Sequence, residues 1–533
     1  MGTLYLYVLV IGAKIMSEEM TIEMSKKIMD EATDKAAELL ETKPAIAEII
    51  LKQLLRVDPE HSTGLQLLGL AKHRMSRNTE AIEIFQTALE IEPGNADNYS
   101  NMGIAYGALG NHQRAIENIK KAIELNPKQY LFYNNLALQY RLIGDHKSAI
   151  ATLEQGIEIS PDKPQMWTNL GGMYGEMKQI KKSMECFEKA LEIDACCAAA
   201  HVDIAFAHHL LGEWEDGFHS YEWRFTYFPQ MEFYKKAYDQ SKRWNGVDSL
   251  EGKTIIVYAE QGLGDCIQFM RFIPKLKSKG CKVIIHCPEG LESIIKRHEG
   301  VDETNIRDIV NNTGPEFPPY DYQCAMMSLP HLLRCFKYSG KPYIKPVTTN
   351  FKKYIDDEYG TDDLKIGVMW AGSPSHPHDQ RRSIPLKHFR SIHDTDGVKL
   401  FSLQFDTRPR KYGGYEMRPG SEGKIVDYSE GCEGMKLVDL TTMIKSMEDT
   451  CTMLAGLDLV ISCDTSVVHL AGAMGVPCWM LLPYNPDWRW GLDGDTTIWY
   501  DSVRIFRQKE RDDWVGVFED VQKELNETLL QNK

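Results

Sequence analysis

The sequence predicts a multidomain fold in which an all-α N-terminal solenoid precedes an α/β region of two Rossmann-like lobes. In the first half, prolines recur every 34 residues, at Pro59, Pro93, Pro127 and Pro161, and a fixed period of this length is typical of a repeat array. In the second half, short apolar strands alternate with amphipathic helices, which favours parallel sheets. The length of 533 residues agrees, because one hydrophobic core rarely organises so long a chain.

Composition narrows the class of protein. Hydrophobic residues make up 43% and charged residues 26% of the chain, as in an ordinary folded protein. The net charge of -15 argues against nucleic-acid binding, which draws on clustered Lys and Arg. The 12 cysteines form no CxxC pair, so neither a zinc site nor a disulfide framework is indicated. We expect reduced thiols in a cytoplasmic protein.

The N-terminal segment, residues 1–27, has an uncertain start. Its apolar stretch from Leu4 to Ile11 follows no basic residues, precedes no clear cleavage site, and is too short to span a bilayer. We therefore expect neither a signal peptide nor a transmembrane segment. Met16 opens a polar helical sequence and is an alternative natural start.

Residues 28–228 are predicted to form the repeat array. Alanines recur in phase with the prolines, and Gly69, Gly103 and Gly171 stand where paired helices would cross closely. These positions closely resemble tetratricopeptide (TPR) repeats. Solenoids of this kind offer a concave surface to a peptide or protein, and a spacer or dimerisation arm is the alternative. The pattern weakens after Ala198 and passes into an aromatic run.

A linker, residues 229–252, leads to the α/β region. The first lobe, residues 253–350, opens with a strand at 254–259, a loop at 260–265, a helix, and a second strand at 282–287. The second lobe, residues 351–533, has strands at 365–370, 399–403, 458–462 and 478–482 and includes a C-terminal helix. In doubly wound sheets, the loops at the carboxyl ends of the strands form the binding crevice.

Five stretches in this region occur together in a specific order: Ala259–Asp265, Trp370–Ser373, Arg381–Leu386, Asp464–Gly472 and Pro483–Trp490. With them, the region resembles the family 9, heptosyltransferase-like glycosyltransferases of GT-B architecture, and most of all the branch with TPR repeats in front. The resemblance implies transfer of a sugar, with inversion, from a nucleotide sugar to a hydroxyl. It also implies an acceptor-side first lobe and a nucleotide-sugar-binding second lobe.

Asp265 stands where a glycine-rich turn enters a helix. The resemblance makes it the general base that removes a proton from the acceptor hydroxyl. A helix N-cap is the structural alternative, because Asp is favoured there. Glu260 is the reserve base, although its position at the end of a strand fits a structural role equally well. Gln261, Gly262 and Gly264 of the same loop are expected to bind substrate.

Asp464, Thr465 and Ser466 open a predicted helix. The free backbone N–H groups and positive dipole of such a helix start suit the diphosphate of a nucleotide sugar. The resemblance implies that His469, in the first turn, contacts the donor near its phosphates or ribose. These four residues are expected to bind substrate.

The second lobe supplies five further expected substrate contacts: Trp370, Gly372, Ser373, Arg381 and Arg382. The arginines follow a polar loop and pair well with phosphate oxygens, although a solvated charge pair is the alternative. Related heptosyltransferases tend to have lysine here, which leaves the donor open. Because no acidic cluster suits a divalent ion, we predict neither a metal nor a cofactor.

The predicted partners are a nucleotide sugar and, by analogy with other TPR-bearing transferases, a protein or peptide acceptor held by the array. Two other functions stay open. One is a non-catalytic TPR scaffold with a ligand-binding lobe, and the other is a nucleotide-sugar epimerase. We expect Trp488 and Trp490 to pack the returning chain against the first lobe, and shaping of the acceptor cleft is the alternative.

Overall fold

The computed structural model describes residues 22–307, 317–345, 351–373, 379–404, 425–427, 432 and 434–531. The chain divides into two compact units between Asp203 and Ile204, inside helix α12 (Ala198–Leu210). Among the described residues, no helix combines the length and the apolar character needed to cross a membrane.

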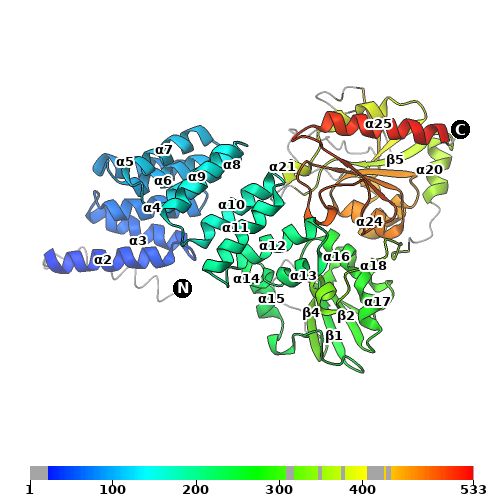
Figure 1. Cartoon of the computed structure of the whole chain (residues 1–533), viewed down its shortest axis with the longest axis horizontal. Helices are drawn as coiled ribbons and strands as arrows, with labels where there is room; N and C mark the ends of the chain where they lie inside the picture. Colours follow the sequence, from blue (N-terminus) through cyan, green and yellow to red (C-terminus); the bar gives the residue numbers. More distant parts are fainter. Residues whose placement is uncertain are drawn as a thin grey trace. The chain divides into compact units, whose positions relative to one another are not determined.

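The first unit is built from helix pairs (Figure 1). Its helices are α2 (Ile22–Leu39), α3 (Pro44–Val57), α4 (Ser62–Arg74), α5 (Asn78–Ile91), α6 (Ala96–Ala108), α7 (His112–Leu125), α8 (Tyr130–Leu142), α9 (His146–Ile159), α10 (Pro164–Glu176) and α11 (Ile180–Ile193). Five of them end 34 residues apart, at Val57, Ile91, Leu125, Ile159 and Ile193. The first four of these ends lie two residues before the periodic prolines, which do not continue a helix. The predicted all-helical solenoid is confirmed.

Glycine allows the helices of a pair to approach closely. A Cβ atom on Gly69 would lie 2.4 Å from Phe85, and one on Gly103 would lie 2.6 Å from Ile119. In each case the obstructing side chain belongs to the second helix of the same pair and is fully buried. These glycines therefore mark the helix crossings that the sequence predicted.

The second unit contains a four-stranded parallel sheet, which we call the first sheet. Its order is β3-β2-β1-β4, with β1 (Thr254–Tyr258), β2 (Lys282–Pro288), β3 (Glu303–Arg307) and β4 (Tyr322–Ala325). Its helices are α16 (Leu263–Phe269), α17 (Ile273–Lys277), α18 (Glu292–Lys296) and α19 (Leu329–Leu332). Strands buried on both faces read as continuous apolar runs, as Ile255, Ile256 and Val257 do.

The second sheet has seven strands in the order β11-β10-β9-β5-β6-β8-β7. They are β5 (Leu364–Met369), β6 (Val398–Ser402), β7 (Ile425–Asp427), β8 (Lys436–Asp439), β9 (Leu459–Cys463), β10 (Cys478–Leu482) and β11 (Val503–Arg507), and β7 alone pairs antiparallel. Its helices include α20 (Phe351–Tyr359), α21 (Asp379–Arg382), α22 (Arg390–His393), α23 (Met447–Leu454), α24 (Ser466–Met474) and α25 (Trp514–Gln531). Because β5 pairs with β6 on one side and β9 on the other, the loops after β5 and β9 flank a crevice.

These sheets and helices confirm the coarser prediction of an α/β region. The finer assignment to a GT-B fold, and the predicted limits of its lobes, stay predictions. The second unit also takes in α13 (Trp214–Tyr221) and α14 (Arg224–Tyr227), which the sequence had placed in the repeat array. It also includes α15 (Met231–Ala237).

The residues predicted as a linker pack on the first sheet. Trp244 is 1% exposed, and its backbone N–H donates to the carbonyl of Gln323 at 2.9 Å. An aromatic side chain of this size contributes a large buried apolar area. Residues around Trp244 thus form part of the α/β core.

Candidate functional site

A cleft of about 620 Å³ lies in the second unit, at the carboxyl ends of β1, β5, β9 and β10. Eleven of the residues predicted from the sequence line it: Gly262, Gly264, Asp265, Gly372, Ser373, Arg381, Arg382, Asp464, Thr465, Ser466 and His469. The lining also includes Leu263, Met369, Pro483, Asn485, Pro486, Asp487 and Arg489. Residues up to 227 positions apart in the sequence, from Gly262 to Arg489, therefore share one cleft.

Gln261 and Trp370 do not line this cleft, and their role as substrate contacts stays a prediction. The Gln261 amide turns away and donates to the Tyr221 hydroxyl at 2.7 Å. Trp370 is 2% exposed and lies in the hydrophobic core of the second sheet. An aromatic side chain at the end of a central strand gains more by core burial than by exposure in a cleft.

Asp265 occupies the third position of α16, whose N-cap is Gly262. Its Oδ2 accepts the backbone N–H of Gly262 at 2.9 Å, so the side chain caps the helix although Asp265 is not the N-cap residue. Its Oδ1 forms an ion pair with Arg489. The carboxylate is 19% exposed and lines the cleft, so Asp265 combines a structural contact with a position open to a ligand.

Arg489, which the sequence did not single out, lies in the short helix η8 (Trp488–Trp490) after β10. Its guanidinium donates to Asp487 at 2.7 Å and to the Gln268 side chain at 2.8 Å, besides the pair with Asp265. Burial opposes its charge, but the carboxylates of Asp265 and Asp487 outweigh burial and raise the pKa of Arg489 above its usual value. The stretch Pro483–Trp490 was the available sequence signal, yet nothing local in it shows a partner 224 residues away.

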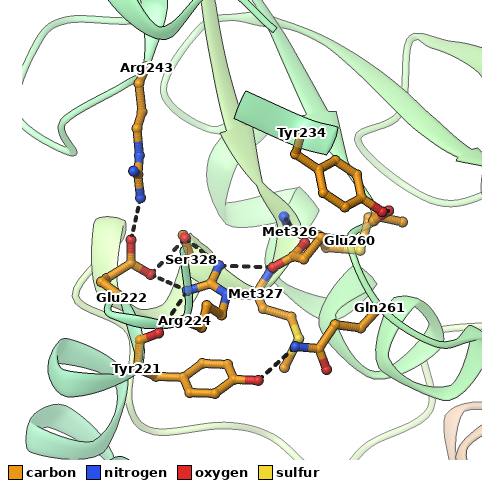
Figure 2. A network of polar contacts seen from close by, with 11 residues as sticks. Tyr221, Glu222, Arg224, Tyr234, Arg243, Glu260, Gln261, Met326, Met327 and Ser328 are labelled. Atoms are coloured by element: carbon orange, nitrogen blue, oxygen red, sulfur yellow. Dashed lines mark hydrogen bonds and ion pairs between the residues drawn. The ribbon is translucent and has the colours of Figure 1, made fainter. Parts of the chain in front are cut away.

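Glu260, the reserve base, lies outside the cleft lining and within a buried polar network (Figure 2). Its carboxylate accepts Arg224 Nη2 at 2.9 Å and the backbone N–H groups of Met326 and Met327 at 3.1 and 3.3 Å. Burial raises the pKa of Glu260, and Arg224 opposes that effect. With three donors directed at it and a fully buried side chain, Glu260 is a structural anion, which favours its structural role over that of a reserve base.

The same network continues to Glu222, which accepts Arg224 at 2.7 Å and Arg243 at 2.8 Å. Ser328 bridges Glu222 and Arg224: its hydroxyl donates to Glu222 at 2.7 Å and accepts from Arg224 at 2.8 Å. Two carboxylates thus face two guanidinium groups (Figure 2). Burial of charge is tolerated where each group is paired in this way.

Helix α24 begins at the cleft with Thr465 as its N-cap. The first N–H groups of a helix have no partner within the helix and suit an anion. The Thr465 hydroxyl lies 3.2 Å from Ser462 Oγ and donates to Met369 Sδ at 3.6 Å, so it is engaged within the protein. Burial, followed by the nearby Asp487 carboxylate, raises the pKa of Asp464 to about 6.

His469 of α24 lines the cleft. It is 5% exposed, and its Nδ1 lies 2.9 Å from the Tyr500 hydroxyl. Burial, followed by the charges of Arg489 and Arg271, lowers the pKa of His469 well below its usual value, so the ring is neutral. Gly264 of α16 faces it closely, because a Cβ atom there would lie 2.7 Å from His469 Cδ2.

Arg382 and Arg381 enter the cleft from α21. Arg382 Nη1 donates to the carbonyl of Asp464 at 2.8 Å, and its Nε donates to Asp379 at 3.4 Å. Gly372 provides room for this guanidinium, since a Cβ atom there would lie 2.2 Å from it. Arg381 is exposed. Residues 374–378 of the polar loop before the arginines lie outside the described residues.

The described part of the chain has no cluster of three or more His, Cys, Asp or Glu side chains placed to hold a metal ion. The cleft instead combines the cations Arg381, Arg382 and Arg489 with carboxylates and a helix start. The arginines of α21 and the helix start can bind an anion, and a carboxylate of the cleft can serve a hydroxyl nearby.

Comparison with known proteins bears on the first unit. Three models of the tetratricopeptide repeat match the chain, over residues 61–128, 101–164 and 164–195. The N-terminal region therefore contains tetratricopeptide repeats, as the sequence predicted.

Among curated proteins, the chain is 24% identical over 327 residues to Protein FlbA of Caulobacter vibrioides. The match covers 57% of this chain and 51% of FlbA, so the chain spans about half the length of this relative. Among solved structures, a thermophilic TPR protein of Thermus thermophilus is 21% identical, covers 34% of this chain and 98% of its own, and gives a TM-score of 0.31. The MamA protein is 26% identical over 31% of this chain and 93% of its own, with a TM-score of 0.26.

Proposed function

We propose that the second unit is a glycosyltransferase, which moves a sugar from a nucleotide-sugar donor to a hydroxyl acceptor with inversion and without a metal. The observation that carries the proposal is the cleft itself. Its lining combines the candidate base Asp265 with the start of helix α24 and with the arginines of α21. A carboxylate facing a site for a leaving diphosphate is what this transfer requires.

In the proposed step, the acceptor oxygen attacks the anomeric carbon of the donor sugar while its proton passes to the Asp265 carboxylate. The bond from that carbon to the phosphate oxygen breaks, and its electron pair leaves with the nucleoside diphosphate. The N–H groups of α24 and the guanidinium of Arg382 stabilise the departing charge. Neutral His469 supplies a hydrogen bond without adding charge.

We further propose that the TPR array holds a protein or peptide acceptor. Solenoids present extended concave surfaces, and TPR repeats belong to that class. A protein acceptor would explain why repeats and a sugar-transferring cleft occur in one chain.

A panel of nucleotide sugars tests the proposal on the purified full chain. Donor binding, donor hydrolysis, epimerised product and mass added to co-expressed proteins are measured separately. Binding with transfer supports the glycosyltransferase, whereas an epimerised donor favours an epimerase. Binding without either reaction favours a scaffold with a ligand site, and no binding by any donor would refute both the transferase and the epimerase.

Asp265→Asn tests the base. We expect transfer to fall by at least about 100-fold while donor affinity stays within about tenfold, because the base acts on the acceptor. Asp495→Asn, which changes an exposed carboxylate outside the cleft lining, is the matched control and should leave both quantities unchanged. Loss of donor binding in Asp265→Asn would mean that the carboxylate serves the donor or the fold.

A further inference from the structure

We infer that Arg489 is the positioning residue for Asp265: its guanidinium fixes the carboxylate of the proposed base and ties it to the second sheet. This inference rests on the proposed transfer reaction. It assigns a role to a residue that the sequence motifs left without one.

The first argument is the distribution of its hydrogen bonds. Nη2 of Arg489 bonds to Asp265, and Nε donates to the Gln268 side chain at 2.8 Å, both on α16 beside the first sheet. Nη1 donates to Asp487 at 2.7 Å, in the loop after β10 of the second sheet. One guanidinium thus joins the helix that carries the base to the sheet that carries α24.

The second argument is that Arg489 is itself held firmly. Its guanidinium carbon lies 4.2 Å from the centre of the Trp488 ring, within cation–π range. Trp488 stacks on His209 at 4.3 Å with the rings inclined by 30°. The Trp499 indole donates to the backbone carbonyl of Arg489 at 2.8 Å. A side chain fixed from so many directions can hold another group in place.

The third argument separates positioning from donor binding. All three guanidinium nitrogens of Arg489 donate to side chains of this protein, and the residue is 9% exposed. To bind a phosphate, Arg489 would need its best-directed N–H donors to be available to the cleft. Of the three nitrogens, Nη2 is directed at Asp265, whose other oxygen is held by the Gly262 N–H. With both oxygens located, the carboxylate presents its remaining lone pairs to the cleft in one orientation.

Two substitutions test the role: Arg489→Met removes the charge and the fork, and Arg489→Lys keeps the charge alone. Single-turnover transfer is measured with enzyme in excess, using the nucleotide sugar that supports turnover by the unaltered protein in the panel. We expect a loss of about 100-fold in Arg489→Met and about tenfold in Arg489→Lys, with donor Kd within about threefold of the parent. Arg504→Met, outside the cleft lining, is the control and should retain full transfer.

A double-mutant cycle with Asp265→Asn decides whether Arg489 acts through the base. If it does, Arg489→Met should cost nothing further once Asp265 is Asn, because the group it positions is gone. Equal losses in both backgrounds would overturn the inference, as would a donor Kd weakened by about 30-fold or more. Unchanged transfer in Asp265→Asn alone would instead overturn the base assignment and with it the proposed mechanism.

Discussion

Glu260 and Asp265 are two carboxylates five residues apart, the first in the loop after β1 and the second in the first turn of α16, yet their surroundings differ in kind. Glu260 is fully buried and receives a guanidinium and two backbone N–H groups. Asp265 receives one guanidinium and one backbone N–H, and it stays 19% exposed at the cleft. The comparison teaches that the number of donors and the access to solvent separate a structural anion from a candidate base, while proximity in sequence does not.

The substitution Arg224→Met in the buried network is the strongest test of this difference between Glu260 and Asp265. It leaves Glu260 buried without its cation, so we expect a loss of about 3–5 kcal/mol in the free energy of unfolding. Asp265→Asn should cost no more than about 1 kcal/mol, because the pair at the cleft is partly exposed and Arg489 keeps Asp487. Denaturant unfolding of the full chain measures both. Equal costs would show that the cleft pair is as structural as the network.

Gly264→Ala tests the cleft side alone. The added Cβ would lie 2.7 Å from His469 Cδ2 and 3.5 Å from Ser466 Cα, so the His469 ring must shift. We expect donor affinity to fall about tenfold, which is about 1.4 kcal/mol. Gly290→Ala is the control, since nothing lies within 4 Å of its added Cβ. Calorimetric titration with the donor reads the difference, and unaltered affinity would exclude the α16–α24 contact as part of the donor site.

Asp464→Asn gives the smallest expected effect and depends on pH. The pKa of Asp464 is about 6 in the folded protein against 3.8 as its ordinary value, so the folded state binds the proton more tightly. The contribution of this proton binding to the free energy of unfolding is fully present below about pH 3.8 and is lost as pH rises through 6. We expect Asp464→Asn to stabilise the ligand-free protein by about 1 kcal/mol at pH 7.5, where the carboxylate is charged and half-buried.

The gain should shrink toward zero near pH 4, where Asp464 is protonated in the folded protein. Thermal unfolding at both pH values measures it, with Asp493→Asn as an exposed control. A gain of equal size at both pH values would show that the substitution acts through packing and not through charge.

Much of the fold was predictable from local patterns. The period of 34 residues located the helix ends, because each repeat reuses the same proline, alanine and glycine positions. The strands were recognisable as apolar runs, because strands of a parallel sheet are buried on both faces. The place of α13 and α14 was not predictable in this way. They follow directly after the repeats in the sequence, and only contacts with Glu260 and Gln261 show that they pack on the first sheet.

The residues of the cleft were likewise predictable only in part from the sequence. Loop residues at the carboxyl ends of strands could be predicted because topology brings those ends together. Gln261 and Trp370 follow strands in the same way but face elsewhere, because Gln261 donates to Tyr221 and Trp370 packs in the core of the second sheet. Arg489 was missed because its meaning lies in its pairing with Asp265, and no local pattern shows a contact that distant.

The network around Arg224 also determines where this protein can be divided and recombined. A fragment beginning at residue 229 would omit Tyr221 and Arg224, and so leave Gln261 and Glu260 without their partners. The compact unit begins instead at Ile204, so α13 and α14 belong to the same unit as the cleft. A gene fusion that exchanged the repeats for another module would therefore keep an intact α/β unit only if the junction lay upstream of α13. In such a fusion, α13 and α14 must stay with the cleft.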